Sequence, residues 1–446
     1  MTAGPNVLVV YVLRQHPLRA TIRDHLYAFE RYGSGRTAYL NLAVRRRVPA
    51  WVRRLRWDLV VFHTSYLATY RWTPDGAPWL RRRSEPLRGL GRVRVALPQD
   101  DFLRSDLVAD VMEELGVDHV FTPVPPSEHA KVYGRMDLDR VRFHLALTGY
   151  LDDDEVERMV AIAREVDDGP GRDLDVGYRA WHAAKWLGRH GRLKTEIARV
   201  FSEEAPKHGL KVDISTRDED TLYGDEWSRF MARSKYTIGV EGGASILDRD
   251  GSLRARVYEY ELDHPDATFE EVEAACFPGR DGELALFAVS PRHLEACVSR
   301  TCQVLVRGEY NGVLEADRHY IPLEPDFSNL DEVLETMRRD DRRAEITEAA
   351  FEDVVRGGRW TYRGFVREVE AVAPADAGPP VPGEPASARA FAIARWQDRA
   401  SWWYVAVLMR VVMPVWLKAL ASIPGPIARP LKRFAMARAQ RRAAGA

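Results

Sequence analysis

The sequence predicts two doubly wound α/β domains that face each other, followed by a linker and an amphipathic helical tail. Short apolar segments recur along residues 7–323, and segments with helical spacing separate many of them. This alternation of strands and helices is typical of parallel sheets with helices on both faces. The alternation is interrupted between residues 150 and 173 and ends before a Pro/Gly/Ala-rich segment at residues 373–388. We therefore expect domains at 1–150 and 151–372, a linker at 373–388 and a tail at 389–446.

Each predicted strand is a short apolar segment, as expected for strands that are buried on both faces. The first domain has predicted strands at 7–12, 37–42, 57–64, 92–99, 118–124 and 141–148. The second has predicted strands at 175–180, 211–215, 236–241, 284–289, 303–306 and 319–323. Pro291 follows one of these strands and begins a helix that Ser290 can cap. A polar insertion at 248–280 is expected to be helical in part.

The chain has 446 residues and a net charge of −1, so its overall charge indicates no nucleic-acid partner. The charge is unevenly distributed: residues 388–446 contain nine Arg, two Lys and one acid, Asp398. This basic tail is expected to meet an acidic surface. The three cysteines lack metal-ligand spacing, and the N-terminus lacks the pattern of a signal peptide. Both features favour a cytoplasmic protein with reduced thiols.

Ligands of open α/β sheets lie beyond the carboxyl ends of the strands. In the first domain this rule selects His16, His63, and the run Gln99, Asp100 and Asp101. His63 has a suitable ordinary pKa for removing a proton from a hydroxyl group, whereas Asp100 would need a raised pKa. A structural role for His63 is the alternative.

In the second domain the same rule selects Arg179, residues 241–245 (Glu-Gly-Gly-Ala-Ser), and Arg292 with Glu295. The glycines could let backbone N–H groups approach a phosphate, or they could form a tight turn with positive φ. Arg292 and Glu295 at a helix N-terminus suit a phosphorylated ligand. The alternative is a solvated arginine and a glutamate that favours the helix dipole.

Pro291, Glu295 and Ala296, followed by the apolar segment 303–306, form an ordered pattern that 321–333 and 349–354 continue. This pattern resembles the donor-binding half of glycosyltransferases with the GT-B fold, of the group 1-like type found in polysaccharide biosynthesis. The resemblance covers residues 174–370 and extends to the first 150 residues in outline. It implies two facing Rossmann-like domains that bind a nucleotide sugar between them.

The resemblance also implies roles for individual residues. Glu295 would bind the donor ribose, and Arg179 and Lys194 would hold the diphosphate; surface solvation of Lys194 is the alternative from the sequence alone. Phe287 stands where these families often carry a first glutamate, so Glu241 is the expected replacement, and the stereochemical outcome stays open. The expected donor-binding residues are Arg179, Lys194, Gly242, Gly243, Ser245, Arg292 and Glu295, and the expected catalytic residues are His63, Asp100 and Glu241. No metal is implied, and no cofactor other than the nucleotide-diphosphate sugar as co-substrate.

The tail has the composition of a helix that lies on a membrane. Residues 402–417 are apolar except for Arg410, but the segment is shorter than a membrane span, and a central Arg costs roughly 2.5–3.5 kcal/mol on insertion. Arg395, Arg399 and Arg410 fall within about 60° of one another on a helix. An interfacial helix on an anionic membrane is therefore predicted, with packing on the protein as the alternative. A second basic segment, 45–57, either adds to this surface or is simply solvated.

Together these features predict a glycosyltransferase that is peripheral at the inner face of the plasma membrane. It would move a sugar from a nucleotide-diphosphate sugar to a hydroxyl acceptor, such as a lipid-linked or cell-surface polysaccharide precursor. One alternative is a polyol-phosphate transferase on the same scaffold. Another is a non-catalytic scaffold that the tail recruits to membranes.

Overall fold

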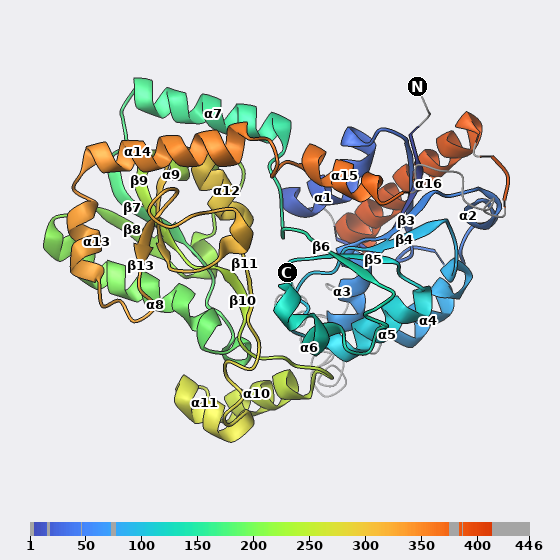
Figure 1. The fold of residues 1–446 in the computed structure, drawn as a ribbon, viewed down its shortest axis with the longest axis horizontal. Helices are drawn as coiled ribbons and strands as arrows, with labels where there is room; N and C mark the ends of the chain where they lie inside the picture. Colours follow the sequence, from blue (N-terminus) through green and yellow to red (C-terminus); the bar gives the residue numbers. More distant parts are fainter. Residues whose placement is uncertain are drawn as a thin grey trace.

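The computed structural model describes residues 4–15, 18–45, 47–72, 77–373, 383–385 and 387–412. These residues form two domains, each with a parallel sheet between layers of helices, which is the arrangement of the GT-B fold (Figure 1). The N-terminal sheet has the order β2-β1-β3-β4-β5-β6, and the C-terminal sheet has the order β13-β12-β9-β7-β8. In both sheets the strand order reverses at the first strand of the domain, β1 or β7. The predicted fold class is confirmed.

The N-terminal strands coincide with the predicted apolar segments. They are β1 (Asn6–Tyr11), β2 (Arg36–Asn41), β3 (Leu59–Phe62), β4 (Val93–Ala96), β5 (His119–Thr122) and β6 (Arg142–Leu145). Residues 7–11 of β1 are fully buried, because helices cover both faces of this central strand. Helix α1 (Ala20–Tyr32) covers one face, and α3 (Thr64–Trp72), α4 (Ala77–Ser84) and α5 (Ser105–Leu115) cover the other. Two shorter helices are α2 (Ala50–Arg54) and α6 (His129–Tyr133).

The C-terminal sheet follows the same plan. Its strands are β7 (Leu174–Arg179), β8 (Val212–Ser215), β9 (Ser234–Gly239), β12 (Cys302–Val306) and β13 (Ile321–Leu323). On one face lie α8 (Arg189–Glu204), α13 (Leu330–Thr336) and α14 (Asp340–Ala350). On the other lie α7 (Asp153–Asp168), α9 (Asp225–Arg233) and α12 (Pro291–Val298).

The segment 284–289 is not a strand of the parallel sheet, contrary to the prediction. It contains β11 (Leu286–Ala288), which pairs antiparallel with β10 (Gly242–Ala244) in a separate two-stranded ribbon. The reason is that β12 pairs directly with β9, so the sheet has no position for a strand between them. The insertion at 248–280 leaves this ribbon and returns to it, and it forms α10 (Ser252–Asp263) and α11 (Phe269–Cys276) as expected.

The last helices return to the N-terminal domain. Helix α15 (Tyr362–Ala371), predicted as part of the second domain, packs on α1, where Phe365 and Val369 join the N-terminal core. Helix α16 (Ala388–Val407) crosses the edge strand β2. Most of the predicted linker (374–382 and 386) and the tail from 413 onward lie outside the described residues. Within the described ranges, no helix is both long enough and apolar enough to cross a membrane.

Candidate active site

A cavity of about 1300 Å³ lies between the two domains. The C-terminal domain contributes the segments that follow β7 and β8 and the first residues of α12. The N-terminal domain contributes Asp100 and Phe102, beyond β4, together with Arg19 and Trp72. The segments after β4, β7 and β8 lie beyond the carboxyl ends of parallel strands, which is the edge that the sequence analysis selected. Helix α12 instead follows β11 of the antiparallel ribbon. The volume is large enough for a ligand of the size of a nucleotide sugar.

The N-terminal end of α12 forms part of the cavity wall. Pro291 is the first helical residue, and the backbone N–H of Ser290 donates a hydrogen bond to His293 Nδ1 at 3.1 Å. The predicted helix start is therefore confirmed. Ser290, Pro291 and Arg292 line the cavity, so the positive end of the helix dipole lies at its surface.

Lys194 of α8 and Arg292 of α12 are two neighbouring cations of this wall. The Arg292 guanidinium lies 5.5 Å from the centre of the Tyr178 ring and 5.6 Å from that of Trp227, and its buried Nε has no hydrogen-bond partner among the described residues. Burial, together with the charge of Arg292, lowers the pKa of Lys194 to about 8, against the opposing effect of Asp100. Within the described ranges, no carboxylate lies within 4.0 Å of either cation. This part of the wall therefore carries positive charge that a bound anion can neutralise.

Glu295 lies one helical turn further along α12 and also lines the cavity. The Trp227 indole N–H donates a hydrogen bond to Glu295 Oε2 at 2.8 Å, which holds the carboxylate in place. Burial raises the pKa of Glu295, while the Trp227 hydrogen bond and the charge of Arg292 lower it. The second carboxylate oxygen receives no hydrogen bond from the residues that the structure describes, so it can accept one from a ligand.

Asp100 faces this wall from the N-terminal domain. It follows β4 with a left-handed backbone conformation (φ 57°), which aspartate tolerates better than most residues. Its side chain is exposed to the cavity. The protein on both sides of the cleft partly desolvates the carboxylate and thereby raises its pKa. The charges of Arg71 and Lys194 act in the opposite direction. Asp100 is therefore a carboxyl group with a raised pKa that lies across the cavity from the cations.

Arg179 lines the cavity, but its guanidinium is engaged within its own domain. It forms an ion pair with Asp213 at 2.8 Å and donates hydrogen bonds to the backbone oxygens of Asp220 and Tyr178. It also packs over the Phe230 ring at 4.4 Å. These contacts already engage the Arg179 guanidinium, so its expected role in holding a diphosphate stays a prediction, whereas Arg292 has no carboxylate partner among the described residues.

Glu241 is buried and points away from the cavity. Its Oε1 accepts a hydrogen bond from the backbone N–H of Tyr310 at 2.7 Å, and burial raises its pKa to about 7. It is not among the residues that line the cavity. This environment indicates that Glu241 stabilises the loop after β12 rather than contacting a ligand.

The glycines after Glu241 allow a close approach of two strands. Gly243 has φ 119°, and a Cβ atom there would lie 1.9 Å from the Leu286 carbonyl oxygen in β11. Gly242 pairs with Ala288 in the same ribbon. Ser245 is buried and donates a hydrogen bond to Asp281 at 2.7 Å. Gly242, Gly243 and Ser245 do not line the cavity, but a Cβ atom at Gly242 would lie 3.9 Å from Lys194 Nζ, so the expected contact of this segment with a phosphate stays a prediction.

His63 is also removed from the cavity. It is fully buried, with its Nε2 2.9 Å from His25 Nδ1 and its Nδ1 2.9 Å from Ser65 Oγ. Burial and the neighbouring His25 lower its pKa well below the ordinary value. Because both ring nitrogens have partners inside the domain, His63 cannot act on a ligand in the cavity. His16 lies outside the described residues.

The sequence analysis missed the aromatic side chains that line the cavity, among them Trp181, Tyr223 and Trp227. Trp181 follows β7 and is 40% exposed, and its indole N–H donates a hydrogen bond to Thr221 Oγ1 at 2.9 Å. Tyr223, beyond β8, is 62% exposed, and Trp227 of α9 completes the group. Trp181 lies only two residues after Arg179, so the strand-end rule could have selected it if aromatic residues had been considered together with charged ones.

No protein-family model and no curated protein match the chain at significant similarity. Solved structures do match. HepE from Anabaena in complex with UDP-glucose is 12% identical, with a TM-score of 0.43, over 82% of this chain and 98% of that chain. Sucrose-phosphate synthase from Thermosynechococcus elongatus is 9% identical, with a TM-score of 0.43, over 82% of this chain and 98% of that chain. AviGT4, a glycosyltransferase involved in avilamycin A biosynthesis, is 13% identical, with a TM-score of 0.37, over 82% of this chain and 96% of that chain. The similarity to these three structures thus extends over most of each chain, at low sequence identity.

Proposed function

We propose that the protein is a glycosyltransferase that moves a sugar from a nucleotide-diphosphate sugar to a hydroxyl group. The observation that carries this is the pair Lys194 and Arg292, two cations without a carboxylate partner among the described residues, at the N-terminal end of α12 in an interdomain cavity. A bound diphosphate supplies negative charge that neutralises these two cations. Arg292 can contact it through two parallel hydrogen bonds, Lys194 acts as a point charge, and the helix dipole favours an anion at this end.

The rest of the donor fits the same wall. Trp181 and Tyr223 are exposed aromatic side chains on which a nucleobase can stack, with the Arg19 guanidinium over one face of the Trp181 ring at 5.1 Å from its centre. Glu295, fixed through Oε2 by Trp227, has Oε1 available to accept hydrogen bonds from ribose hydroxyl groups. The cations hold the diphosphate between the nucleoside and the sugar, which places the sugar toward the N-terminal domain.

The transfer then requires a leaving-group site and a base. The acceptor oxygen bonds to the anomeric carbon of the sugar, and the bond from that carbon to the diphosphate oxygen breaks. Lys194 and Arg292 offset the negative charge that develops on the nucleoside diphosphate as it leaves. Asp100, across the cavity and with a raised pKa, accepts the proton of the acceptor hydroxyl group.

We further propose that the acceptor is a lipid-linked or cell-surface polysaccharide precursor and that the protein acts at the inner face of the plasma membrane. Supporting this are the exposed aromatic side chains of α16 beside Arg395 and Arg399, which have no carboxylate within 4.0 Å among the described residues. Such a composition suits the boundary between water and lipid.

A thermal-shift screen with nucleotide sugars, followed by calorimetry with the nucleoside diphosphate of the best ligand, tests the donor site. Arg292→Gln removes one charged contact and is expected to weaken binding by roughly 10- to 100-fold. Glu295→Ala is expected to weaken binding and abolish transfer with an unchanged melting temperature. Arg189→Gln is the control, because Arg189 is paired with Glu273 outside the cavity.

The products distinguish the competing functions. Sugar transfer releases a nucleoside diphosphate, whereas polyol-phosphate transfer releases a nucleoside monophosphate. A non-catalytic scaffold binds no nucleotide at all. Nucleotide binding that Glu295→Ala and Arg292→Gln leave unchanged would show that the donor does not bind at this wall.

A further inference from the structure

One face of α16 attaches this helix to the N-terminal domain. The buried residues of this face are Phe391, Ala394, Asp398, Ser401 and Val405. At 100° per residue they fall within about 80° of one another. Asp398 accepts hydrogen bonds from Tyr11 Oη at 2.6 Å and Tyr27 Oη at 2.9 Å. Because Asp398 is the only acid in residues 388–412, its burial leaves the outer surface of α16 without negative charge.

The opposite face exposes large apolar side chains, which we call the aromatic stripe. Its members are Ile393 (44% exposed), Trp396 (69%), Trp403 (70%) and Tyr404 (52%). They fall within about 100° of one another on the helix. Soluble surfaces rarely gather side chains of this size on one narrow face without a partner.

The two edges of the aromatic stripe differ. Along one edge lie Arg395 and Arg399, both exposed. At the other edge, Gln397 contacts the segment around α2: Trp51 Nε1 donates to Gln397 Oε1 at 2.9 Å, and Arg45 donates to the Gln397 backbone oxygen at 3.2 Å. Figure 1 shows α16 beside α2 at the same end of the molecule. The stripe is therefore continuous with the basic segment 45–57.

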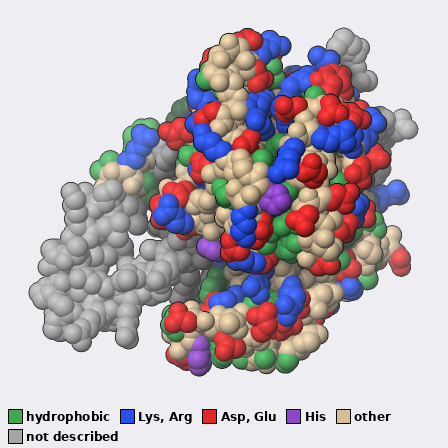
Figure 2. Space-filling model, turned by 90° about the vertical axis from the view of Figure 1, so that its left-hand side faces the viewer, with side chains coloured by type: hydrophobic (Ala, Val, Ile, Leu, Met, Phe, Trp, Pro, Cys, Tyr) green, Lys and Arg blue, Asp and Glu red, His purple; other side chains and the backbone are tan. Residues whose placement is uncertain are grey.

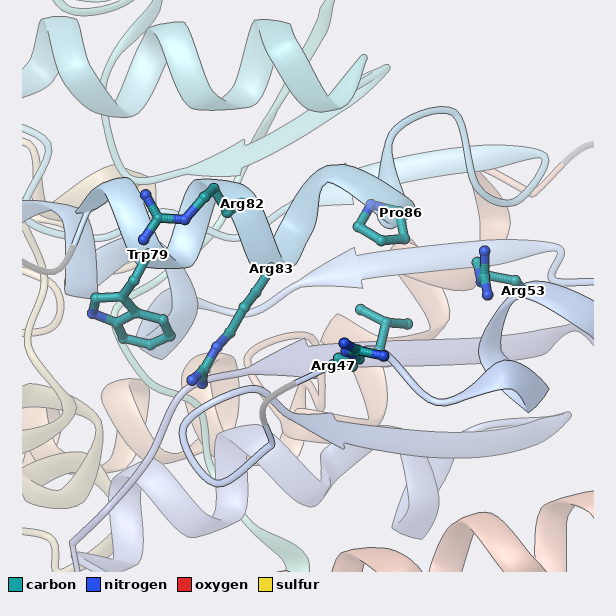
Figure 3. A pocket seen from close by; sticks show the side chains of 7 residues that line it. Arg47, Arg53, Trp79, Arg82, Arg83 and Pro86 are labelled. Carbon is teal, nitrogen blue, oxygen red and sulfur yellow. The ribbon is translucent and has the colours of Figure 1, made fainter.

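A groove of about 400 Å³ lies beyond α2, and we call it the arginine groove (Figure 3). It is lined by Arg47, Val48, Arg53, Trp79, Arg82, Arg83 and Pro86. Arg83 packs over the Trp79 ring at 4.6 Å and donates a hydrogen bond to the Leu42 backbone oxygen. Among the described residues, no acid lines the groove and no carboxylate lies within 4.0 Å of its four arginines. In contrast, Figure 2 shows basic and acidic side chains interspersed over the face that the C-terminal domain presents.

We infer that the aromatic stripe and the arginine groove form one membrane-docking face whose partner is an anionic phospholipid bilayer. Tryptophan and tyrosine prefer the boundary between lipid and water, where the ring is buried and the polar group stays hydrated. Arginines without carboxylate partners complement lipid phosphates, which their planar donors can contact in pairs. The two halves come from segments about 350 residues apart in the sequence and meet only in the fold.

Two other occupants of the stripe fit the charges less well. Residues 413–446 of the same chain contain seven Lys and Arg and no acid, so the arginines beside the stripe repel them and the same bilayer attracts them. A second copy would bring two identical arginine-edged faces together. This inference deepens the membrane part of the proposed function and does not depend on the nucleotide site.

Sedimentation of the full chain with vesicles of phosphatidylcholine, with or without one quarter phosphatidylglycerol, tests the face. Trp396→Ser/Trp403→Ser is expected to lower partitioning into the anionic vesicles at least about tenfold, because two large side chains no longer enter the interface. Leu145→Ser/Leu262→Ser is the matched control, since these leucines are 41% and 82% exposed outside this face, and it should bind as the wild type does.

The groove is tested by Arg47→Gln/Arg53→Gln. This variant is expected to partition about tenfold less into anionic vesicles and to show unchanged partitioning into neutral vesicles. Arg189→Gln/Arg229→Gln, which removes two ion-paired arginines of the C-terminal domain, should change neither. Circular dichroism and nucleotide calorimetry establish that each variant is folded and keeps its donor site.

Three results would overturn the inference. In the first, the tryptophan variant binds anionic vesicles as tightly as the wild type, which would assign binding to residues 413–446 alone. In the second, the wild type is a dimer by light scattering and the tryptophan variant a monomer, which would make the stripe a self-interface. In the third, the wild type binds neutral and anionic vesicles equally, which would show that the arginines do not contribute to binding.

Discussion

If a nucleotide binds at Lys194 as proposed, we expect its affinity to fall as the pH rises, because the pKa of Lys194 is lowered in the free protein. In the free protein, burial and the charge of Arg292 hold the pKa of Lys194 at about 8, so the ammonium form predominates at pH 7 and the neutral amine at pH 9. A bound diphosphate favours the ammonium form and raises this pKa. The protein must therefore take up a proton to bind the nucleotide at high pH, and the affinity is expected to fall as the pH rises through 8.

The size of the effect follows from the two pKa values. If the bound nucleotide restores the ordinary value of 10.5, linkage predicts a dissociation constant about tenfold higher at pH 9 than at pH 7. At pH 8 the free amine is half protonated and the bound amine almost fully, so about half a proton is taken up for each nucleotide bound.

Calorimetry at constant ionic strength from pH 7 to 9 measures the affinity, and two buffers with different ionisation enthalpies count the protons. Lys194→Met should bind more weakly at pH 7 and lose the pH dependence. Lys185→Met is the matched control, because the Lys185 ammonium is paired with Glu261 at 2.9 Å on the same cavity wall. A wild-type affinity that is level from pH 7 to 9, or a Lys194→Met variant that keeps the tenfold change, would refute the reasoning.

Two further predictions concern the carboxyl groups. Asp100→Asn is expected to slow transfer at saturating nucleotide roughly 100-fold or more, because the side chain acts on the acceptor proton. Steady-state kinetics beside calorimetry checks this, because loss of the Asp100 charge also acts on Lys194; a loss confined to nucleotide affinity would contradict it. The pKa of Glu241 is raised from 4.5 to about 7, so the stability it contributes is fully present below pH 4.5 and is lost as the pH rises through 7. Glu241→Gln keeps an acceptor for the Tyr310 N–H and should stabilise the protein by about 1–3 kcal/mol at pH 8 and little at pH 4; thermal melts at both pH values measure this, and an equal change at both would count against it.

Local sequence features account for much of the fold and for part of the site. The apolar segments became strands close to their predicted bounds, because a strand buried on both faces must be apolar at nearly every position. Pro291 began α12 as expected, since proline needs no partner for a backbone N–H at that position. Asp100 lines the cavity beyond β4, as the strand-end rule predicted. Arg292 and Glu295 line it too, although the strand before them, β11, belongs to the antiparallel ribbon and not to the parallel sheet.

Other features depend on contacts between residues that are distant in the sequence. The segment 284–289 has the composition of a buried parallel strand, but β12 pairs directly with β9 and excludes it from the sheet. Arg179 and Arg292 are equally plausible phosphate ligands by residue type. Only the fold places Asp213 against Arg179 and leaves Arg292 without a carboxylate partner among the described residues.

The basic character of the tail and its helical spacing can be read directly from the amino acids, because both are properties of a single segment. In contrast, the side of α16 that faces water depends on contacts with residues that are distant in the sequence. The tyrosines that bind Asp398 come from β1 and α1, nearly 400 residues earlier, and they fix the rotation of the helix so that Trp396 and Trp403 point outward. Composition therefore predicts that α16 is a membrane-binding helix, and long-range hydrogen bonding decides which of its side chains are exposed.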